Sequence, residues 1–240
     1  MKKLVTLLGL LLVGNYVLSQ SLAPYQKQIT LEKINVDAWA AGIEKGTEDD
    51  LKDAFSAYVK KNFNLKSKKN GRHGLVVPEA TLPQVTTRRG DLHVQFSNDT
   101  GRPEMAVAFM MGYDIYLNAR ENPQEMERFK EFFTTFLFNY YKEYYEKMIR
   151  EKEKMLKDLR SQIADNEKKV KSLQSDIEKT QKKIAKESDQ LKKTELENKN
   201  VVARRQIDAL NEMNANNNKQ ITNIENEINQ IKMQMANIGK

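Results

Sequence analysis

The chain contains no cysteine among its 240 residues. Without cysteine there are no disulfide bonds, no thiolate nucleophiles and no metal sites with cysteine ligands. Only two histidines occur, His73 and His93, and they are too far apart in the sequence to form the paired-histidine motif of zinc proteases. A nucleophile elbow and a phosphate-binding glycine loop are also missing. The sequence therefore predicts no catalytic residue, no cofactor and no metal, and we do not expect an enzyme.

Long apolar runs are missing as well, apart from one at the N-terminus. Two lysines precede the apolar segment 4–13, which is about half of the ~20 residues that a membrane-spanning helix needs. Small residues follow, and together these features predict a secretory signal peptide over 1–20, cleaved near Ser19 to Ser21. An uncleaved anchor is the alternative. No cysteine follows that could carry a lipid, so we expect the protein in the periplasm or secreted.

Positive charges exceed negative charges only mildly over the whole chain. The formal net charge of +7 falls to +5 when the two N-terminal lysines leave with the signal peptide. This balance is weak for a nucleic-acid-binding protein, and export separates the chain from DNA. We therefore expect no nucleic acid among its partners.

Positive charge is nevertheless concentrated in one segment that contains no acidic residue. We call these six residues the basic patch: Lys60, Lys61, Lys66, Lys68, Lys69 and Arg72. Cations favour the C-terminal end of a helix, so a solvated helix end explains the patch. The functional alternative is a site for an acidic surface or for lipid headgroups, which Arg88 and Arg89 could extend.

The segment 21–145 combines strand and helix patterns and predicts an α+β domain. Alternating apolar and polar residues over 28–36 predict a strand, which a glycine-containing loop follows. Thr47 and Asp50 have the spacing of a capping box, so a helix should begin there and end near Asn62. About 100 residues are enough to bury one hydrophobic core.

Three further strands are predicted over 74–82, 92–96 and 104–111. Pro78 and Pro83 cannot donate hydrogen bonds to a neighbouring strand, so their strand should lie at an edge or contain a bulge. The turn-forming run 97–101 predicts a hairpin between the last two strands. Together with the helix that follows, the predicted order is β-α-β-β-β-α.

Asn122 and Pro123 predict the start of a long helix, with asparagine as the cap and proline at the first helical position. Its first part carries aromatic residues along one face, which we interpret as packing on the sheet: Phe129, Phe132, Phe133, Phe136, Tyr140 and Tyr144. Phe138, Tyr141 and Tyr145 widen this face beyond what one sheet usually covers. A subunit interface is the alternative interpretation of this aromatic flank.

The last part of the chain, 146–240, repeats an apolar residue at every seventh position among charged and amide residues. This is the repeat of a coiled coil. One uninterrupted set consists of Ile149, Leu156, Ile163, Val170, Ile177, Ile184 and Leu191. A second set consists of Ile207, Leu210, Ile221, Ile224, Ile228, Ile231, Met235 and Ile238. The two sets are out of phase, because steps of seven from Leu191 reach residue 219 rather than Ile221.

A reversal of the chain explains this change of phase, since the offset fits neither a three- nor a four-residue insertion. We predict an antiparallel helical hairpin with its tip near 197–200, where turn-tolerant asparagines occur. This register would place Asn214 near Ile184. A single kinked rod and a turn within 211–218 are the alternatives.

Four features of the sequence occur together in a known group of proteins. They are Ser19-Gln20 at the end of the signal, the helical segment 51–55, Tyr116-Leu117 and the Glu/Lys-rich rod. In this combination the chain resembles a group of uncharacterised exported proteins of Bacteroidota, which has no established activity to transfer. The architecture is also similar to periplasmic chaperones of the Skp/OmpH type. In this chain, however, the globular part is a whole N-terminal domain rather than a small body formed from both ends.

A rod holds, spaces or grips other molecules, and this chain devotes over a third of its length to one. We therefore expect an exported, non-enzymatic structural or interaction protein of the cell envelope that assembles through its coiled coil. Its partners would be an unidentified protein and further copies of itself. A periplasmic, chaperone-like holder of unfolded client proteins is the alternative, and an envelope enzyme or enzyme regulator is a further one.

Overall fold

The computed structural model describes residues 22–98 and 102–239, so the predicted signal peptide lies outside the described residues. The chain forms two units, each with its own internal packing. The first contains residues 22–138 together with 236–239, and we call it the sheet domain. The second contains residues 139–235 and is the helical hairpin. The predicted α+β class with a long C-terminal helical part is confirmed.

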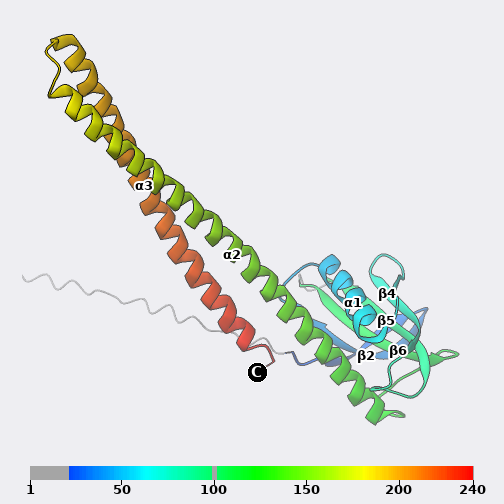
Figure 1. Cartoon of the computed structure of the whole chain (residues 1–240). Coiled ribbons are helices and arrows are strands. Elements are labelled where there is room, and N and C mark those ends of the chain that lie inside the picture. The colour runs from blue at the N-terminus through cyan, green and yellow to red at the C-terminus, as the bar shows by residue number, and fades with distance from the viewer. Residues whose placement is uncertain (1–21, 99–101, 240) are drawn as a thin grey trace, which may run out of the picture. The chain divides into compact units, whose positions relative to one another are not determined.

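The sheet domain is built on one antiparallel sheet of seven strands in the order β1-β2-β6-β5-β4-β3, with β7 paired to β6. The strands are β1 (Tyr25–Leu31), β2 (Ile34–Gly42), β3 (Lys68–Lys69), β4 (Gly74–Thr81), β5 (Arg89–Ser97), β6 (Glu104–Gly112) and β7 (Ile115–Tyr116). Figure 1 shows this sheet beside the helix α1 (Glu48–Phe63). The order of elements is therefore β-β-α-β-β-β-β-β before the long helix.

The predicted order was wrong at the first strand, because 28–36 contains a hairpin rather than one strand. β1 and β2 pair from Tyr25 with Ala40 to Leu31 with Ile34. Glu32 and Lys33 form the two-residue turn between them, with φ angles of 47° and 75°. Such left-handed turns usually contain asparagine or glycine, so Glu-Lys carries no turn signal in the sequence.

The predicted strands 74–82, 92–96 and 104–111 correspond to β4, β5 and β6. The expected bulge in the first of them is confirmed, since the register of β4 shifts between Val77 and Ala80, and Glu79 has a φ of 53°. β5 and β6 pair up to Ser97 and Glu104, as the predicted hairpin requires. Residues 99–101 of that turn lie outside the described residues.

Helix α1 begins at the predicted capping box. The Thr47 hydroxyl accepts a hydrogen bond from the Asp50 amide, and the Asp50 carboxylate accepts one from the Thr47 amide at 2.8 Å. The helix ends at Phe63, and Asn64 follows in the left-handed conformation, which asparagine tolerates better than most residues. Leu51, Phe55 and Val59 form its buried stripe.

Both helices of the sheet domain pack on the same face of the sheet. Paired residues of neighbouring strands point to the same side, so the side chains of Val94, Val107 and Phe109 share one face. The long helix α2 (Pro123–Ile184) begins at the predicted proline and covers this face, but the side-chain oxygen of Asn122, the expected cap, has no hydrogen-bond partner among the described residues. Its Phe129 ring contacts Phe109, and the indole nitrogen of Trp39 donates to the Met126 carbonyl at 2.8 Å. The predicted aromatic face is thus the core of the domain.

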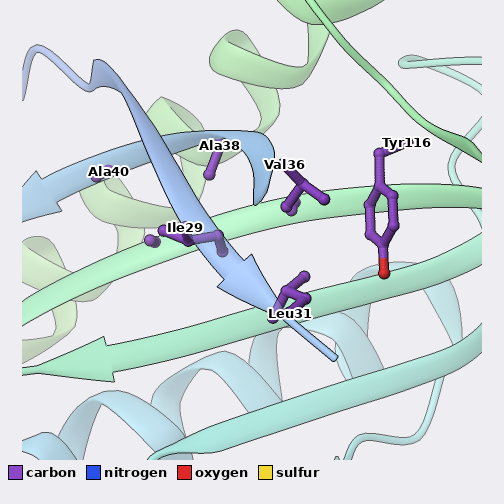
Figure 2. Close-up of a cluster of buried hydrophobic side chains, with 8 residues drawn as sticks. Ile29, Leu31, Val36, Ala38, Ala40 and Tyr116 are labelled. Atoms are coloured by element: carbon purple, nitrogen blue, oxygen red, sulfur yellow. The ribbon is translucent and has the colours of Figure 1, made fainter. Parts of the chain in front are cut away.

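The opposite face of the sheet carries a second, smaller cluster made largely of alanine and β-branched residues. Its buried members are Ile29, Leu31, Val36, Ala38, Ala40, Ala106, Ala108 and Tyr116. Figure 2 shows the β1 side chains beside those of β2, with the Tyr116 ring at one end of the cluster. The small side chains allow the β1–β2 hairpin to pack closely against the neighbouring residues of β6 and β7 in this cluster.

The C-terminal helices form an antiparallel hairpin, as predicted, because α3 (Gln190–Ala236) returns along α2 (Figure 1). The predicted position of the tip was wrong. The chain reverses at 185–189, and the segment 197–200 lies inside α3. The asparagines at 198 and 200 do not form the turn, because they lie within a helix that begins at an earlier cap. That cap is Asp189, whose carboxylate accepts from the amides of Leu191 and Lys192.

Candidate functional site

Hydrogen bonds and ion pairs define the register of the hairpin. The Asn166 amide donates to the Asn214 side-chain oxygen at 2.9 Å, and Asn217 donates to Gln162 at 3.4 Å. Nearer the base, Arg160 pairs with Glu225 at 2.8 Å, and Lys152 pairs with Glu227. The expected register was therefore wrong, because Asn214 lies opposite Asn166 rather than Ile184. Because the chain reverses before the expected tip, each residue of α3 faces a residue of α2 that lies nearer the base of the hairpin than expected.

The predicted seam is tightly closed only near the base of the hairpin. Its fully buried members there are Leu156, Ile224, Ile228 and Ile231. Ile149, Leu159 and Ile221 pack against them and are half-buried. Ile163, Val170, Ile177 and Ile184 lie on the seam but stay half-buried as well. Two helices leave both sides of a seam open, so the apolar side chains of the outer half, from Ile163 to Ile184, stay partly accessible between the polar layers.

One predicted seam residue is not part of the seam. Leu191 continues the repeat in the sequence, but the tip reverses the chain before it, and it lies in the first turn of α3. Its side chain is 79% exposed. The sevenfold spacing did not reveal this, because spacing alone does not show where a helix ends.

A groove of about 480 Å³ opens beside the polar Asn166–Asn214 layer of the hairpin. Its lining combines the apolar side chains of Leu173, Ala209 and Leu210 with the polar side chains of Lys169, Ser172 and Gln206. The Asn-Asn pair takes the place of an apolar layer and thereby fixes which residues of the two helices face each other. We call the lining of this groove, together with the half-buried seam residues from Ile163 to Ile184, the outer seam.

The basic patch is exposed throughout, and none of its six residues forms an ion pair within the described ranges 22–98 and 102–239. Lys60 and Lys61 lie in the last turn of α1, where cations complement the helix dipole. Lys68 and Lys69 are the whole of β3, the last strand of the sheet. Lysines on an edge strand discourage pairing with other chains. Local structure therefore accounts for much of the patch.

The two arginines that could have extended the patch have partners of their own. Arg89 forms an ion pair with Glu79 at 2.6 Å, across the bulge of β4. The Arg88 guanidinium lies 3.8 Å from the Met111 sulfur. The structure gives no contact between either arginine and the basic patch.

The aromatic flank of α2 is smaller than the sequence indicated. Tyr141 and Tyr145 are buried within the single chain, with exposed fractions of 3% and 2%. Only Phe138 stays open, at 43%. It borders a groove of about 590 Å³ in the sheet domain, together with Leu22, Thr134 and Ile238. The alternative interpretation of the flank as a subunit interface is therefore wrong for Tyr141 and Tyr145, which are covered within the single chain.

A polar network occupies the exposed edge of the face opposite the helices. The Glu104 carboxylate accepts from Lys27 at 2.5 Å, from Ser97 at 3.1 Å and from the Tyr25 hydroxyl. Burial disfavours the charged carboxylate, but these hydrogen bonds outweigh it and lower the pKa of Glu104. Burial and the neighbouring carboxylate raise the pKa of Tyr25 to about 12. The network ties β1 to β5 and β6.

The second histidine, His93, is buried in the middle of β5 beside the Tyr116 ring. Neither ring nitrogen has a hydrogen-bond partner among the described residues. Burial lowers the pKa of His93, and the nearby charges of Asp91 and Glu32 offset this only in part. The folded protein therefore holds this imidazole neutral more strongly than the unfolded chain does.

A His93→Leu variant is expected to remove part of the protein's sensitivity to acid. Since the folded-state pKa is depressed, the unfolded chain binds the extra proton first, and stability falls as the pH drops below about 6.5. At neutral pH, leucine should also stabilise the fold by about 1–2 kcal/mol, because it removes two unpaired buried nitrogens. Urea unfolding at pH 5 and pH 7.5 measures both effects. An acid-induced loss as large in His93→Leu as in the wild-type protein would contradict the assignment.

A second concentration of positive charge, which the sequence analysis missed, lies at the tip of the hairpin. Its members are Lys182, Lys183, Lys186, Lys192 and Lys193. They flank the reversal of the chain on both sides, so a turn placed at 197–200 would have separated them. The signal was present as two lysine pairs around Asp189, the true cap of α3.

No group of three or more histidine, aspartate or glutamate residues within 22–98 and 102–239 is arranged to hold a metal ion. In the same part of the chain, no helix has the length and apolar character needed to cross a membrane. Comparison with known proteins adds no assignment, because no family model, curated protein or solved structure matches this chain.

Proposed function

We propose that this protein is a non-enzymatic interaction protein of the bacterial cell envelope that assembles through its helical hairpin. The observation that carries the proposal is the outer seam. A hairpin stabilised only by contacts between its own two helices would need no partly exposed apolar side chains along its outer half. The half-buried residues there, from Ile163 to Ile184, would be covered if a second hairpin packed against the first.

The polar layers of the hairpin support an assembling rather than a purely structural seam. The Asn166–Asn214 hydrogen bond replaces an apolar contact and fixes which residues of the two helices face each other. A fixed register keeps the groove at Leu173 and Leu210 in one place along the rod. Identical chains could therefore dock with closed symmetry, each presenting the same groove. The envelope location rests on the predicted signal peptide.

Ala209→Glu tests this assembly. Ala209 lines the groove and is itself exposed, so glutamate there adds a charge to the docking surface without removing a buried seam contact. We expect the wild-type protein at tens of micromolar to sediment at two or more times the mass of one chain. The variant should shift to one chain, because an unpaired charge buried in an interface costs several kcal/mol.

Ala215→Glu is the matched control, since it makes the same change on an exposed position of α3 away from the groove. It should leave the sedimentation unchanged, and circular dichroism should show equal helix content in both variants. A wild-type protein that sediments as one chain would contradict the assembly. So would an equal shift in both variants.

A second function is favoured by the same groove, because an apolar recess between two arms could hold a segment of an unfolded client. A chaperone-like holder would then keep the outer seam open instead of pairing it. In this case the wild-type protein would sediment as one chain and would suppress aggregation of a heat-unfolded client. Ala209→Glu would abolish that suppression, and Ala215→Glu would not.

A further inference from the structure

The tip of the hairpin combines five lysines with one exposed leucine. Lys182, Lys183 and Lys186 end α2 and enter the turn, and Lys192 and Lys193 begin α3. In the described part of the chain, none of the five lysines forms an ion pair. Leu191, 79% exposed, lies between the two groups.

The acidic residues of the tip are turned toward the backbone. The Glu187 carboxylate accepts from the amides of Ser188 and Asp189, each at 3.1 Å. The Asp189 carboxylate accepts from Leu191 at 2.9 Å and from Lys192 at 3.3 Å. Both carboxylates are thus engaged in closing the turn. The two carboxylates keep their charge, so the tip carries five positive charges against two negative ones and presents a net positive potential to other molecules.

Local helix electrostatics explain only part of this arrangement. Lys182 and Lys183 lie in the last turn of α2, where they complement the helix dipole. Lys192 and Lys193 lie in the first turn of α3, which contains no acidic residue. Cations at a helix N-terminus oppose the dipole, so this pair weakens its own helix. An external anion bound beside these lysines would offset that cost.

We propose that the tip of the hairpin docks on an anionic phospholipid membrane surface. Five lysines act as point charges that need no defined partner geometry, which suits a plane of phosphate groups. Leu191 projects from the same turn and would insert between the headgroups, where an exposed apolar side chain gains from leaving water. An acidic protein would satisfy the charges, but it gives no comparable reason for an exposed leucine. The inference goes beyond the proposed assembly, because it applies to one hairpin or to several.

The basic patch of the sheet domain is the weaker candidate for the same role. Its lysines at the end of α1 and in β3 suit the helix dipole and the sheet edge. The Lys192–Lys193 pair at the tip has no comparable local function. This difference separates the two surfaces and decides which variants to compare.

The double variant Lys186→Gln/Lys192→Gln tests the tip directly. The exported form of the chain is mixed with vesicles of phosphatidylcholine alone or with about a third phosphatidylglycerol, and binding is measured by flotation. Each lysine near an anionic surface strengthens binding about fivefold, so the double variant should bind the anionic vesicles about 30-fold more weakly. Leu191→Ser should weaken binding about tenfold. Binding should also fall as salt is raised, because salt screens the charges.

Two controls remove the same charge elsewhere. Lys154→Gln/Lys171→Gln changes exposed lysines on the outer side of α2, and Lys60→Gln/Lys61→Gln changes the basic patch. Both should bind the anionic vesicles within about threefold of the wild-type protein, given that distant exposed charges are screened. Equal loss in the tip variant and either control would overturn the proposal, as would wild-type binding that does not distinguish the two vesicles.

A parallel measurement with polyglutamate in place of vesicles separates lipid from acidic protein. Binding to polyglutamate that depends on the tip lysines, without binding to anionic vesicles, would overturn the membrane assignment. Loss of vesicle binding in Leu191→Ser, with polyglutamate binding unchanged, would support it. These outcomes do not depend on the oligomeric state, so a failure here is distinct from a failure of the proposed assembly.

Discussion

Gly90→Ala is expected to unfold most of the sheet domain or to destabilise it by about 3 kcal/mol or more. A Cβ atom at Gly90 would lie 2.0 Å from the Met110 carbonyl oxygen and 2.9 Å from the Phe109 ring. The first of these contacts is with backbone, which cannot move aside without breaking the pairing of β5 with β6. The methyl group therefore has no space unless two central strands separate.

Trp39 provides the measurement for this variant. It is the only tryptophan of the chain, is buried, and donates its indole hydrogen bond inside the sheet domain. Its fluorescence during urea unfolding therefore reports on that domain and not on the hairpin. Gly42→Ala is the control, because a Cβ there meets no atom within 4 Å. It should change the unfolding free energy by less than about 1 kcal/mol; an equal effect of both variants would contradict the steric explanation.

Phe133→Ala is expected to cost about 3–5 kcal/mol, the usual penalty for emptying a well-packed aromatic site. Phe133 lies fully buried on the face of α2 that covers the sheet, stacked on Phe136 at a centroid distance of 6.4 Å. Phe136 in turn contacts Phe55 of α1, with centroids 5.1 Å apart. The cavity would therefore open where both helices meet the sheet. Trp39 fluorescence during urea unfolding measures the loss.

Phe138→Ala is the matched control on the same helix, since this ring is 43% exposed. It should cost less than about 1.5 kcal/mol, because only part of its surface is removed from water. A cost equal to that of Phe133→Ala would show that something covers Phe138 in solution. If that cost also rose with protein concentration, the covering surface would be a second copy of the chain.

The two charged surfaces lead to different expectations for the envelope. The basic patch is spread over a helix end and a sheet edge, whereas the tip lysines gather at one end of a hairpin. The outer seam and the tip are separate residues, so variants of one should leave the other's function intact.

Local features of the sequence predicted the elements that depend only on neighbouring residues. The capping box at Thr47, the bulge around Pro78 and the start of α2 at Pro123 occur where they were expected. Each depends on a hydrogen bond or a fixed φ within a few residues of chain. The β1–β2 turn was missed because Glu32 and Lys33 adopt positive φ without being residues that favour it.

The candidate site was predicted less well, because it depends on contacts between distant residues. The hairpin was anticipated from the change of phase, but Asp189 caps α3 ahead of the asparagines at 198 and 200. This early cap moved the register and placed Leu191 in solvent. It also joined the two lysine pairs on either side of Asp189 into one tip.

The sequence by itself determined that the chain has an α+β domain and a coiled-coil hairpin, because periodicity and caps are local properties. Tertiary structure alone decided which surfaces remain exposed. Tyr141 and Tyr145 became buried, while Phe138 and Leu191 did not. Burial depends on what packs against a side chain, and those partners lie far away in the sequence. For this reason the pattern of apolar residues predicted the rod, whereas only the folded chain revealed its outer seam and its basic tip.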